Sequence, residues 1–193
     1  MIIDNILDQA KSAIPKRVFL FEIEAKLYAI AVEYVDRVMK IPPITPIPNA
    51  PRAIVGIFHL RGQVVVALDL LRRMNVPKQG PLTSNFLFVV HDGKEKFAVL
   101  IDKPKTIVSV MEKDIFEPDP VIIAQVPKHY IWGVFLYQEH LSIHKEHSII
   151  IDKVGEREGA VEEKTSPALP VILLDITKLL DQDDLSSVLA SQV

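Results

Sequence analysis

The sequence predicts an all-β fold, and three observations support this prediction. Short apolar runs rich in β-branched and aromatic residues recur along the chain, and turn-forming residues separate them. Their spacing of roughly 8 to 12 residues is typical of barrels and sandwiches, and helical periodicity is too sparse for alternating strand–helix units. The runs expected to form strands are residues 18–23, 27–32, 35–41, 54–60, 64–70, 86–90, 97–101 and 106–110.

The N-terminal segment, residues 1–16, has the spacing of a helix and not of a strand. Its apolar residues recur every three or four positions, and they are Ile3, Ile6, Leu7, Ala10 and Ile14. Pro15 then ends the pattern. We expect a short helix that covers part of the core, and a helix that binds a partner is the alternative.

Two turns and one buried strand organise the expected sheets. Asp92-Gly93 is the clearest hairpin signal in the chain. Arg61-Gly62 divides two other runs, and Gly62 can take a positive φ there. Residues 64–68 are apolar without alternation, which predicts a strand covered on both faces.

Two stretches interrupt the strands. Residues 41–53 contain Pro42, Pro43, Pro46, Pro48 and Pro51, which predicts a rigid extended connector, with a proline-rich ligand as the alternative. Residues 155–168 are polar and punctuated by glycine, which predicts a mobile loop. After this loop we expect a strand at 171–174, a helix at 175–180 and a polar tail at 181–193.

Composition and charge exclude several classes of protein. The chain has 22 Lys and Arg against 25 Asp and Glu, a net charge of -3, so the basic excess typical of nucleic-acid binding is absent. It has no cysteine, which excludes disulfides and thiolate nucleophiles and suits a cytoplasmic location. No apolar run approaches the roughly 18 residues that a membrane helix needs, so we expect no direct membrane insertion.

The motifs of common enzymes are missing from the sequence. There is no GxGxxG, no phosphate-binding GxxxxGK[ST] and no GxSxG, so we expect no catalytic residues and no cofactor. His140, His144 and His147 would share a face on a helix and could hold zinc, whereas on a strand His147 would lie on the other face from His140 and His144. We favour the strand and expect no metal site, and a metal-dependent enzyme is the distant alternative. Asp69 and Asp102 each end an apolar strand, where an aspartate usually caps the next turn or helix.

The order of several segments resembles the CheW-like domain family. These segments lie within residues 17–136 and 170–180, and they are FLFEIEAKLYAIAVEYVDRV, TPIPNAP, GIFHLRGQVVVALDL, FAVLID, YIWGV and ILLDITKLL. The most specific part is Leu-Arg-Gly followed by an apolar strand that ends in Asp-Leu, with TPIPNAP just before it. The resemblance implies one domain over residues 17–180, made of two packed SH3-like five-stranded β-barrel subdomains with short peripheral helices. We expect the first barrel at about residues 28–85 and the second at about 86–150, completed by the terminal segments. Residues 138–170 form an insertion relative to the family.

The resemblance also implies a function. Such proteins are non-enzymatic adaptors of chemotaxis signal transduction that couple chemoreceptors (methyl-accepting proteins) to a CheA-type sensor histidine kinase. One surface contacts the regulatory domain of the kinase, and a groove between the subdomains takes the cytoplasmic tip of the chemoreceptor. A coupling protein of a pilus, twitching or other non-flagellar two-component pathway is the alternative.

By the same resemblance, six positions are expected to bind partners: Arg61, Gly62, Val35, Arg37, Val38 and His59. Arg61 corresponds to the arginine of the Leu-Arg-Gly motif, and Val35 to a valine of the family's docking strand. Arg37 stands where the family commonly has Glu, and His59 where it frequently has Asn. We expect the reversed charge at Arg37 to change which partner is tolerated.

Overall fold

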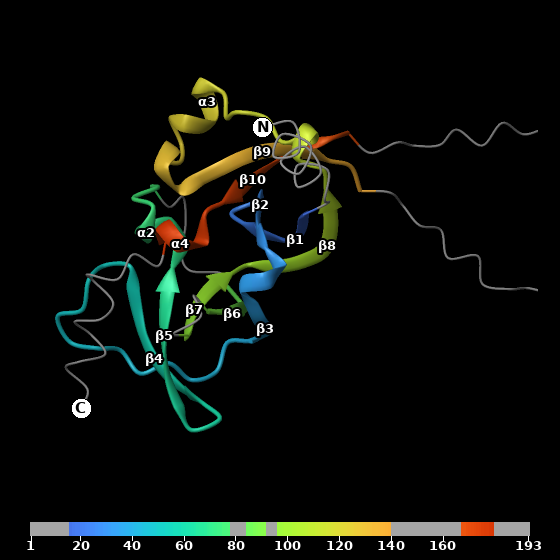
Figure 1. The fold of residues 1–193 in the computed structure, drawn as a ribbon. Coiled ribbons are helices and arrows are strands. Elements are labelled where there is room, and N and C mark those ends of the chain that lie inside the picture. The colour runs from blue at the N-terminus through green and yellow to red at the C-terminus, as the bar shows by residue number, and fades with distance from the viewer. Residues whose placement is uncertain (1–15, 78–83, 92–95, 140–166, 180–193) are drawn as a thin grey trace, which may run out of the picture.

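The computed structural model describes residues 16–77, 84–91, 96–139 and 167–179. These residues form two five-stranded sheets, seen one above the other in Figure 1. Sheet A contains, in spatial order, β8 (Lys103–Val110), β1 (Lys16–Ile23), β2 (Lys26–Ala31), β10 (Leu169–Leu174) and β9 (Ile131–Tyr137). Sheet B contains β3 (Val35–Lys40), β6 (Phe86–His91), β7 (Lys96–Ile101), β5 (Gln63–Asp69) and β4 (Ile54–Leu60). The expected all-β fold is confirmed.

The helices are short and peripheral, as expected. The α-helices are α2 (Leu70–Arg73), α3 (Pro120–Ile123) and α4 (Ile176–Leu179). The 3-10 helices are η1 (Val32–Tyr34), η2 (Glu112–Asp114) and η3 (Lys128–Tyr130). The expected N-terminal helix, the loop at 155–168, the tail at 181–193 and the Asp92-Gly93 turn lie outside the described residues.

The strand pairing corrects the expected division of the chain at residue 86. We expected β6 and β7 in the second subdomain, but they lie between β3 and β5 in sheet B. Their place follows from a parallel pairing of β5 with β7, in which Val66 lies opposite Phe97. β2, expected to open the first subdomain, instead pairs with β10 from the end of the chain, with Val171 opposite Leu27. The sequence order of the strands therefore does not give the order in the sheets.

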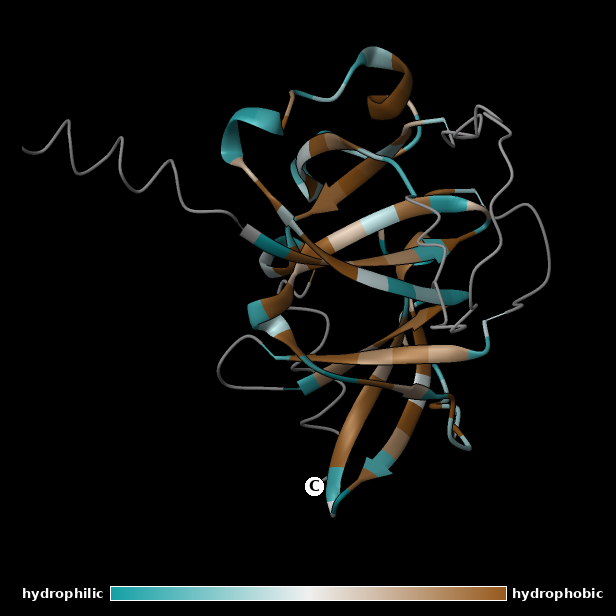
Figure 2. Ribbon diagram, turned by 90° about the vertical axis from the view of Figure 1, so that its right-hand side faces the viewer, coloured by the Kyte–Doolittle hydropathy of each residue, from teal (hydrophilic) through white to brown (hydrophobic). Residues whose placement is uncertain are grey.

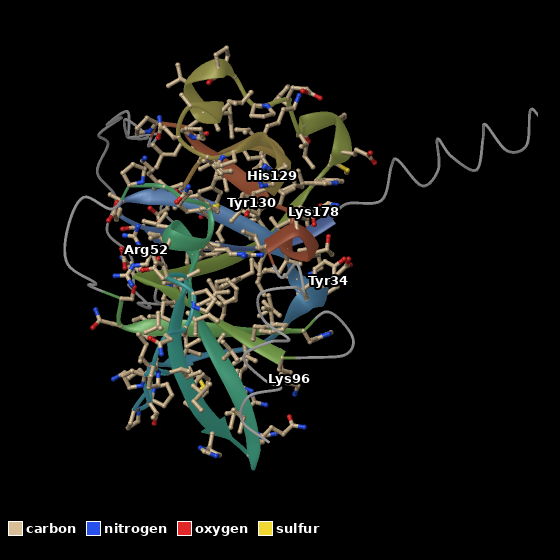
Figure 3. The ribbon with its side chains drawn as sticks, turned by 90° about the vertical axis from the view of Figure 1, so that its left-hand side faces the viewer. Tyr34, Arg52, Lys96, His129, Tyr130 and Lys178 are labelled. Atoms are coloured by element: carbon tan, nitrogen blue, oxygen red, sulfur yellow. The ribbon has the colours of Figure 1, made fainter. Side chains whose placement is uncertain are left out.

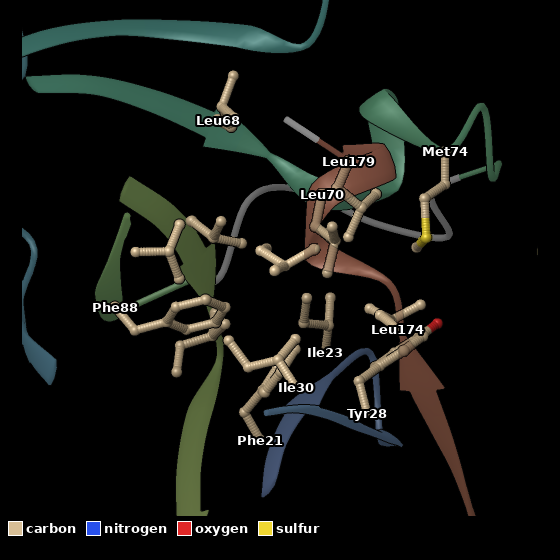
Figure 4. Packing of buried hydrophobic residues seen from close by; sticks show 14 of the residues in the cluster. Phe21, Ile23, Tyr28, Ile30, Leu68, Leu70, Met74, Phe88, Leu174 and Leu179 are labelled. Carbon is tan, nitrogen blue, oxygen red and sulfur yellow. The ribbon is translucent and has the colours of Figure 1, made fainter. Parts of the chain in front are cut away.

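The largest apolar core lies between the two sheets. It joins side chains of both sheets with those of α2 and α4, among them Phe21, Tyr28, Phe88, Leu70 and Leu179 (Figure 4). Each sheet packs a separate, smaller core against its other face. Both faces of a central strand are therefore covered, which requires continuous apolar sequence.

Strand β5 shows this double burial directly. Val66 and Leu68 belong to the core between the sheets, whereas Val65 and Ala67 belong to the core behind sheet B. The predicted strand with two covered faces is confirmed for these residues.

Aromatic rings connect the two sheets. The Phe88 ring of β6 lies 4.9 Å from the Phe21 ring and 5.7 Å from the Phe19 ring of β1, measured between ring centroids. Such tilted and edge-on arrangements are favourable beyond the area that they bury. The position of sheet A on sheet B therefore depends on this cluster.

Hydrogen bonds between α2, η3 and α4 add to the connection. The Arg73 guanidinium donates to the carbonyl of Leu179 at 2.9 Å, and the Tyr130 hydroxyl donates to the carbonyl of Arg73 at 3.4 Å. Figure 3 shows Tyr130 and Lys178 on this side of the molecule. The contact ties an element of sheet B to the C-terminal helix of the sheet A side.

The expected capping role is confirmed for Asp69, whereas Asp102 binds a turn distant in sequence and not the next one. Asp69 is the N-cap of α2, and its carboxylate accepts a hydrogen bond from the backbone N–H of Arg72 at 3.2 Å. Asp102 accepts from the backbone N–H of Glu24 at 2.8 Å and from the Ser84 hydroxyl at 3.1 Å. Glu24 has a φ of 49°, so Asp102 stabilises the tight turn between β1 and β2.

Candidate functional site

A groove runs between the edge strand β3 of sheet B and the edge strand β8 of sheet A. This β3–β8 groove encloses about 610 Å³. Val35, Arg37 and Val38 line one side, and Thr106 and Ile107 line the other. Val38 is 38% exposed and Ile107 47% exposed, so both sides present apolar surface to a partner. Edge strands that face each other in this way leave room for an added element.

A β-bulge in β3 decides which side chains face the groove. The register shifts between Val35, which pairs with Val90, and Arg37, which pairs with Val89, so Asp36 has no partner residue of its own. Val38 then lies opposite Phe88. Because Val90 and Phe88 both face the core between the sheets, Val35 and Val38 share that face although they are three positions apart. Without the bulge, the two valines would point to opposite faces.

The charges in β3 are paired with one another. Asp36 Oδ2 lies 3.4 Å from Arg37 Nε and 3.2 Å from Lys96 Nζ. Lys96, labelled in Figure 3, starts β7. The hydrogen bond from Lys96, followed by the charges of Lys96 and Arg37, lowers the pKa of Asp36 below its usual value. Arg37 therefore brings a partly neutralised charge to the groove.

The hairpin tip between β4 and β5 is a second candidate surface, and it projects from the body of sheet B (Figure 2). Leu60 pairs with Gln63, so Arg61 and Gly62 form a two-residue turn. Their φ angles are 51° and 81°, which is the pattern of a type I′ turn. The predicted positive φ of Gly62 is confirmed.

Arg61 occupies a backbone position that an arginine does not favour. The first central residue of a type I′ turn is usually Asn, Asp or Gly, and other residues are strained by about 1 kcal/mol in this conformation. The side chain is exposed, and no hydrogen bond or ion pair joins it to another residue in the described part of the chain. The five N–H donors of its guanidinium are thus directed to solvent, where a carboxylate or carbonyl of a partner can accept them.

The two residues beside the turn extend the tip surface. His59 is exposed and pairs across the hairpin with Val64, which is 39% exposed. Leu60 packs against the core behind sheet B and anchors the hairpin from below. The tip therefore combines a cation, an imidazole and an apolar side chain.

The proline-rich connector fixes the hairpin to the rest of sheet B. Thr45 and Ile57 exchange two backbone hydrogen bonds of 2.8 and 2.9 Å. Gly56, with a φ of 153°, lies so close to this connector that a Cβ would overlap the carbonyl oxygen of Thr45 and the Ile44 side chain. The segment between β3 and β4 is thus tied to sheet B by backbone hydrogen bonds and close packing.

The structure divides the six expected binding residues into two groups. Val35, Arg37 and Val38 lie in the β3–β8 groove, whereas His59, Arg61 and Gly62 lie at the β4–β5 tip. β3 and β4 are the two opposite edge strands of sheet B, so the groups do not form one site.

The sequence reasoning missed the β8 side of the groove. Thr106 and Ile107 complete it, and Lys105 beside them is held by Glu22, with 3.5 Å between Nζ and Oε2. One feature of the sequence could have indicated it: Ile107 is apolar, whereas Thr106 and Ser109 of the same strand are polar and exposed. That pattern indicates an exposed apolar residue, but the partner strand across the groove cannot be inferred from it.

Among the described residues, no group of three or more His, Cys, Asp and Glu side chains is placed to hold a metal ion. His140, His144 and His147 lie outside the described residues, so the metal-dependent alternative is not tested. None of the helices in the described ranges has the length and apolar character to cross a membrane.

Two exposed surfaces of this kind, one apolar and one carrying a guanidinium without a partner among the described residues, are typical of a class of protein: a module that binds other proteins. The comparison with known families is specific. The chain belongs to the CheW-like domain family, whose model matches residues 17–184.

Relatives and a solved structure agree with this assignment. The chemotaxis protein CheW of Treponema pallidum is 30% identical over 134 residues, which is 65% of this chain and 78% of that protein. The chemotaxis protein CheW of Rhizobium meliloti is 24% identical over 119 residues, or 62% of this chain and 76% of that protein. The crystal structure of the scaffolding protein TtCheW from Thermoanaerobacter tengcongensis has a TM-score of 0.62 at 20% identity, covering 88% of this chain and 95% of that chain.

Proposed function

We propose that this chain is a non-enzymatic adaptor that couples chemoreceptors to a CheA-type histidine kinase in the cytoplasm. The match of the CheW-like family model to residues 17–184 carries this proposal, because it spans both docking surfaces. The relatives named above are chemotaxis proteins, which supports a chemotaxis pathway over pilus-driven motility.

The two surfaces have complementary roles in this proposal. The β3–β8 groove receives the helical tip of a chemoreceptor, whose apolar side chains pack on Val38 and Ile107. The β4–β5 tip contacts the regulatory domain of the kinase through Arg61. Because the surfaces lie on opposite edge strands of sheet B, both partners bind at once. Simultaneous binding lets the state of the receptor bias the state of the kinase.

Arg37 sets partner choice in the groove. It lies beside Asp36 on the bulged strand, and a change to glutamate places two carboxylates next to each other. Arg37→Glu should therefore shift affinity between partners whose facing surfaces differ in charge, while the fold is retained.

The test uses the purified full chain, a cytoplasmic receptor fragment and the regulatory domain of the kinase from the same cell. Val38→Asp should weaken receptor binding about tenfold or more and leave kinase binding unchanged. Arg61→Ala should weaken kinase binding and leave receptor binding and the melting temperature unchanged.

Matched controls are Val121→Asp, a more exposed valine on α3, and Arg52→Ala, an exposed arginine of the proline-rich connector. Both should bind like the wild type in isothermal titration calorimetry. If Val38→Asp and Arg61→Ala weaken the same partner equally, the division of roles is wrong. If the wild-type chain binds neither partner, the adaptor role itself is wrong.

A further inference from the structure

The outer edge of β9 is paired over only part of its length. Val134 and Phe116 exchange two backbone hydrogen bonds of 2.7 and 2.9 Å, so both polar backbone groups of Val134 point away from β10. Backbone groups alternate along a strand, so those of Phe135 point to Val171 of β10. The N–H and C=O of Leu136 then point to the outer edge again.

The chain that pairs with Val134 does not continue alongside Leu136. In an antiparallel ladder, Asp114 would be the residue opposite Leu136. Asp114 instead belongs to η2, and its N–H donates to the carbonyl of Met111 at 3.0 Å. A cavity of about 450 Å³ lies at this place, between Leu136 and Tyr137 of β9 and Val108 to Val110 of β8.

The same edge carries large exposed apolar side chains. Leu136 is exposed near the end of β9, Phe116 lies opposite the buried Val134, and Trp132 lies at a register shift in the pairing of β9 with β10. Trp132 is 44% exposed, Phe116 56% and Leu136 63%. Exposed aromatic and leucine side chains grouped in this way are typical of binding hot spots and not of ordinary surface.

The edge is held rigidly open. Gly133 of β9 leaves no room for a Cβ, because the Ile115 side chain occupies that position. Ile115 and Phe116 are thereby fixed against β9 on one side of the cavity, while β8 is fixed to β1 on the other. A site formed in advance loses little free energy to ordering when a partner binds.

From these observations we infer that the Leu136 edge of β9 binds an extended segment of a further protein, which adds to sheet A as a short strand. An extended segment is the occupant because a strand supplies both the acceptor and the donor that the Leu136 backbone lacks among the described residues. Its apolar side chains pack on Phe116 and Leu136. A basic side chain faces Asp114, which lines the cavity and forms no ion pair with another described residue.

This site is distinct from the β3–β8 groove and the β4–β5 tip, so the inference does not rest on the proposed coupling function. Lys103, Pro104 and Lys105 protect the first half of the β8 edge against strand addition. The second half, Thr106 to Val110, has neither charge nor proline, and its last three residues, Val108 to Val110, border the cavity. The protection is therefore missing where the cavity lies.

The experiment titrates the full chain with a synthetic seven-residue peptide of alternating Lys and Val, capped at both ends, and follows backbone amides by nuclear magnetic resonance. The wild type should bind, and hydrogen exchange of the Leu136 amide should slow. A peptide of the same composition with proline at its centre should bind at least about tenfold more weakly, because it loses a backbone donor. Leu136→Lys should weaken binding to the same extent, and the matched control Val121→Lys should not.

Asp114→Lys tests the charge separately from the fold of β9. This variant should weaken binding of the Lys–Val peptide but not of a Thr–Val peptide, because only the Lys–Val peptide carries charge. Equal binding of the proline peptide by the wild type, or no binding of either peptide, overturns the inference. Slow exchange of the Leu136 amide in the free chain would show that the chain covers its own edge. If sedimentation shows a dimer that Leu136→Lys abolishes, a second copy of the chain covers the edge. Either of these two results also overturns the inference.

Discussion

The β3–β8 groove and the β4–β5 tip lie on opposite edges of the same sheet, but they present different chemistry. In the groove, Val38 and Ile107 supply apolar surface, and Asp36 is paired with the neighbouring cations. At the tip, Arg61 has no partner among the described residues and sits on a strained two-residue turn. One sheet can therefore offer apolar burial at one edge and a directed cation at the other.

This difference in chemistry predicts that binding at the two surfaces responds differently to salt. In the proposed roles, binding in the groove rests mainly on buried apolar area, and Asp36 partly neutralises Arg37, so salt should affect it little. In the same proposal, binding at the tip uses the Arg61 guanidinium, which reaches a partner through charge-assisted hydrogen bonds that salt weakens. Both surfaces depend on the core between the sheets, because that core sets the position of every strand that carries them.

The largest expected effect comes from a substitution in the core between the sheets, on which both surfaces depend. Phe88 is completely buried between the sheets and contacts the rings of Phe19 and Phe21. Phe88→Ala should lower the free energy of unfolding by about 3–5 kcal/mol, because it leaves a cavity and removes the ring contacts. Thermal denaturation followed by circular dichroism measures the loss, which should exceed that of Phe88→Leu. If Phe88→Ala destroys only one surface, the sheets do not share a single core.

A smaller loss of stability is expected at the tip, where a substitution of Gly62 strains the backbone without a side-chain clash. Gly62 has a φ of 81°, and a Cβ there would meet no other atom within 4 Å. Gly62→Val should therefore cost about 1–2 kcal/mol through backbone strain alone, a decrease in melting temperature of about 3–6 °C. Gly62→Asn should cost much less, because asparagine tolerates a positive φ. Equal melting temperatures for the two variants would show that the turn does not need this conformation.

Most of the fold was predictable from local sequence. Continuous apolar runs located β5, and turn residues located the β4–β5 hairpin, because these features depend on neighbouring residues alone. The capping role of Asp69 followed from its position at a strand end, but the turn that Asp102 stabilises, between β1 and β2, is distant in sequence. The assignment of strands to sheets was not predictable, because the parallel pairings of β5 with β7 and of β2 with β10 join distant segments.

The candidate site was predictable only in part. The resemblance pointed to Val35, Arg37 and Arg61, but it gave no indication that Asp36 pairs with Arg37 and Lys96. That triad depends on a bulge in β3 and on the pairing of β6 with β7, which brings Lys96 opposite His91. The β8 side of the groove and the Leu136 edge of β9 were missed for the same reason: both form where strands end or separate in space.

Salt dependence distinguishes the two surfaces without changing the fold. Raising the salt concentration from about 50 mM to 500 mM should weaken kinase binding severalfold, because screening acts over a few ångströms at high salt. Receptor binding in the groove should change less than about twofold. In Arg61→Ala the remaining kinase binding should lose most of its salt dependence in calorimetric titrations. A salt dependence that persists in this variant would mean that other charges hold the kinase.

The smallest expected effect concerns the paired charges of the groove. The hydrogen bond from Lys96 is the main cause that lowers the pKa of Asp36, so the folded state binds this proton less tightly than the unfolded state. The stabilisation is therefore present above the ordinary pKa of 3.8 and is lost as the pH falls through the lower pKa of the folded state. Because the pair is partly solvated, it contributes less than about 1 kcal/mol. Between about pH 5 and pH 2, wild-type stability should decrease slightly more than that of Asp36→Asn, measured by urea denaturation at each pH. Lys96→Met should abolish most of this difference, and Arg37→Met less of it, because the Lys96 hydrogen bond dominates the shift. If the wild type and Asp36→Asn lose stability in parallel, the triad does not hold β3 at its bulge, and the groove keeps its shape through apolar contacts alone.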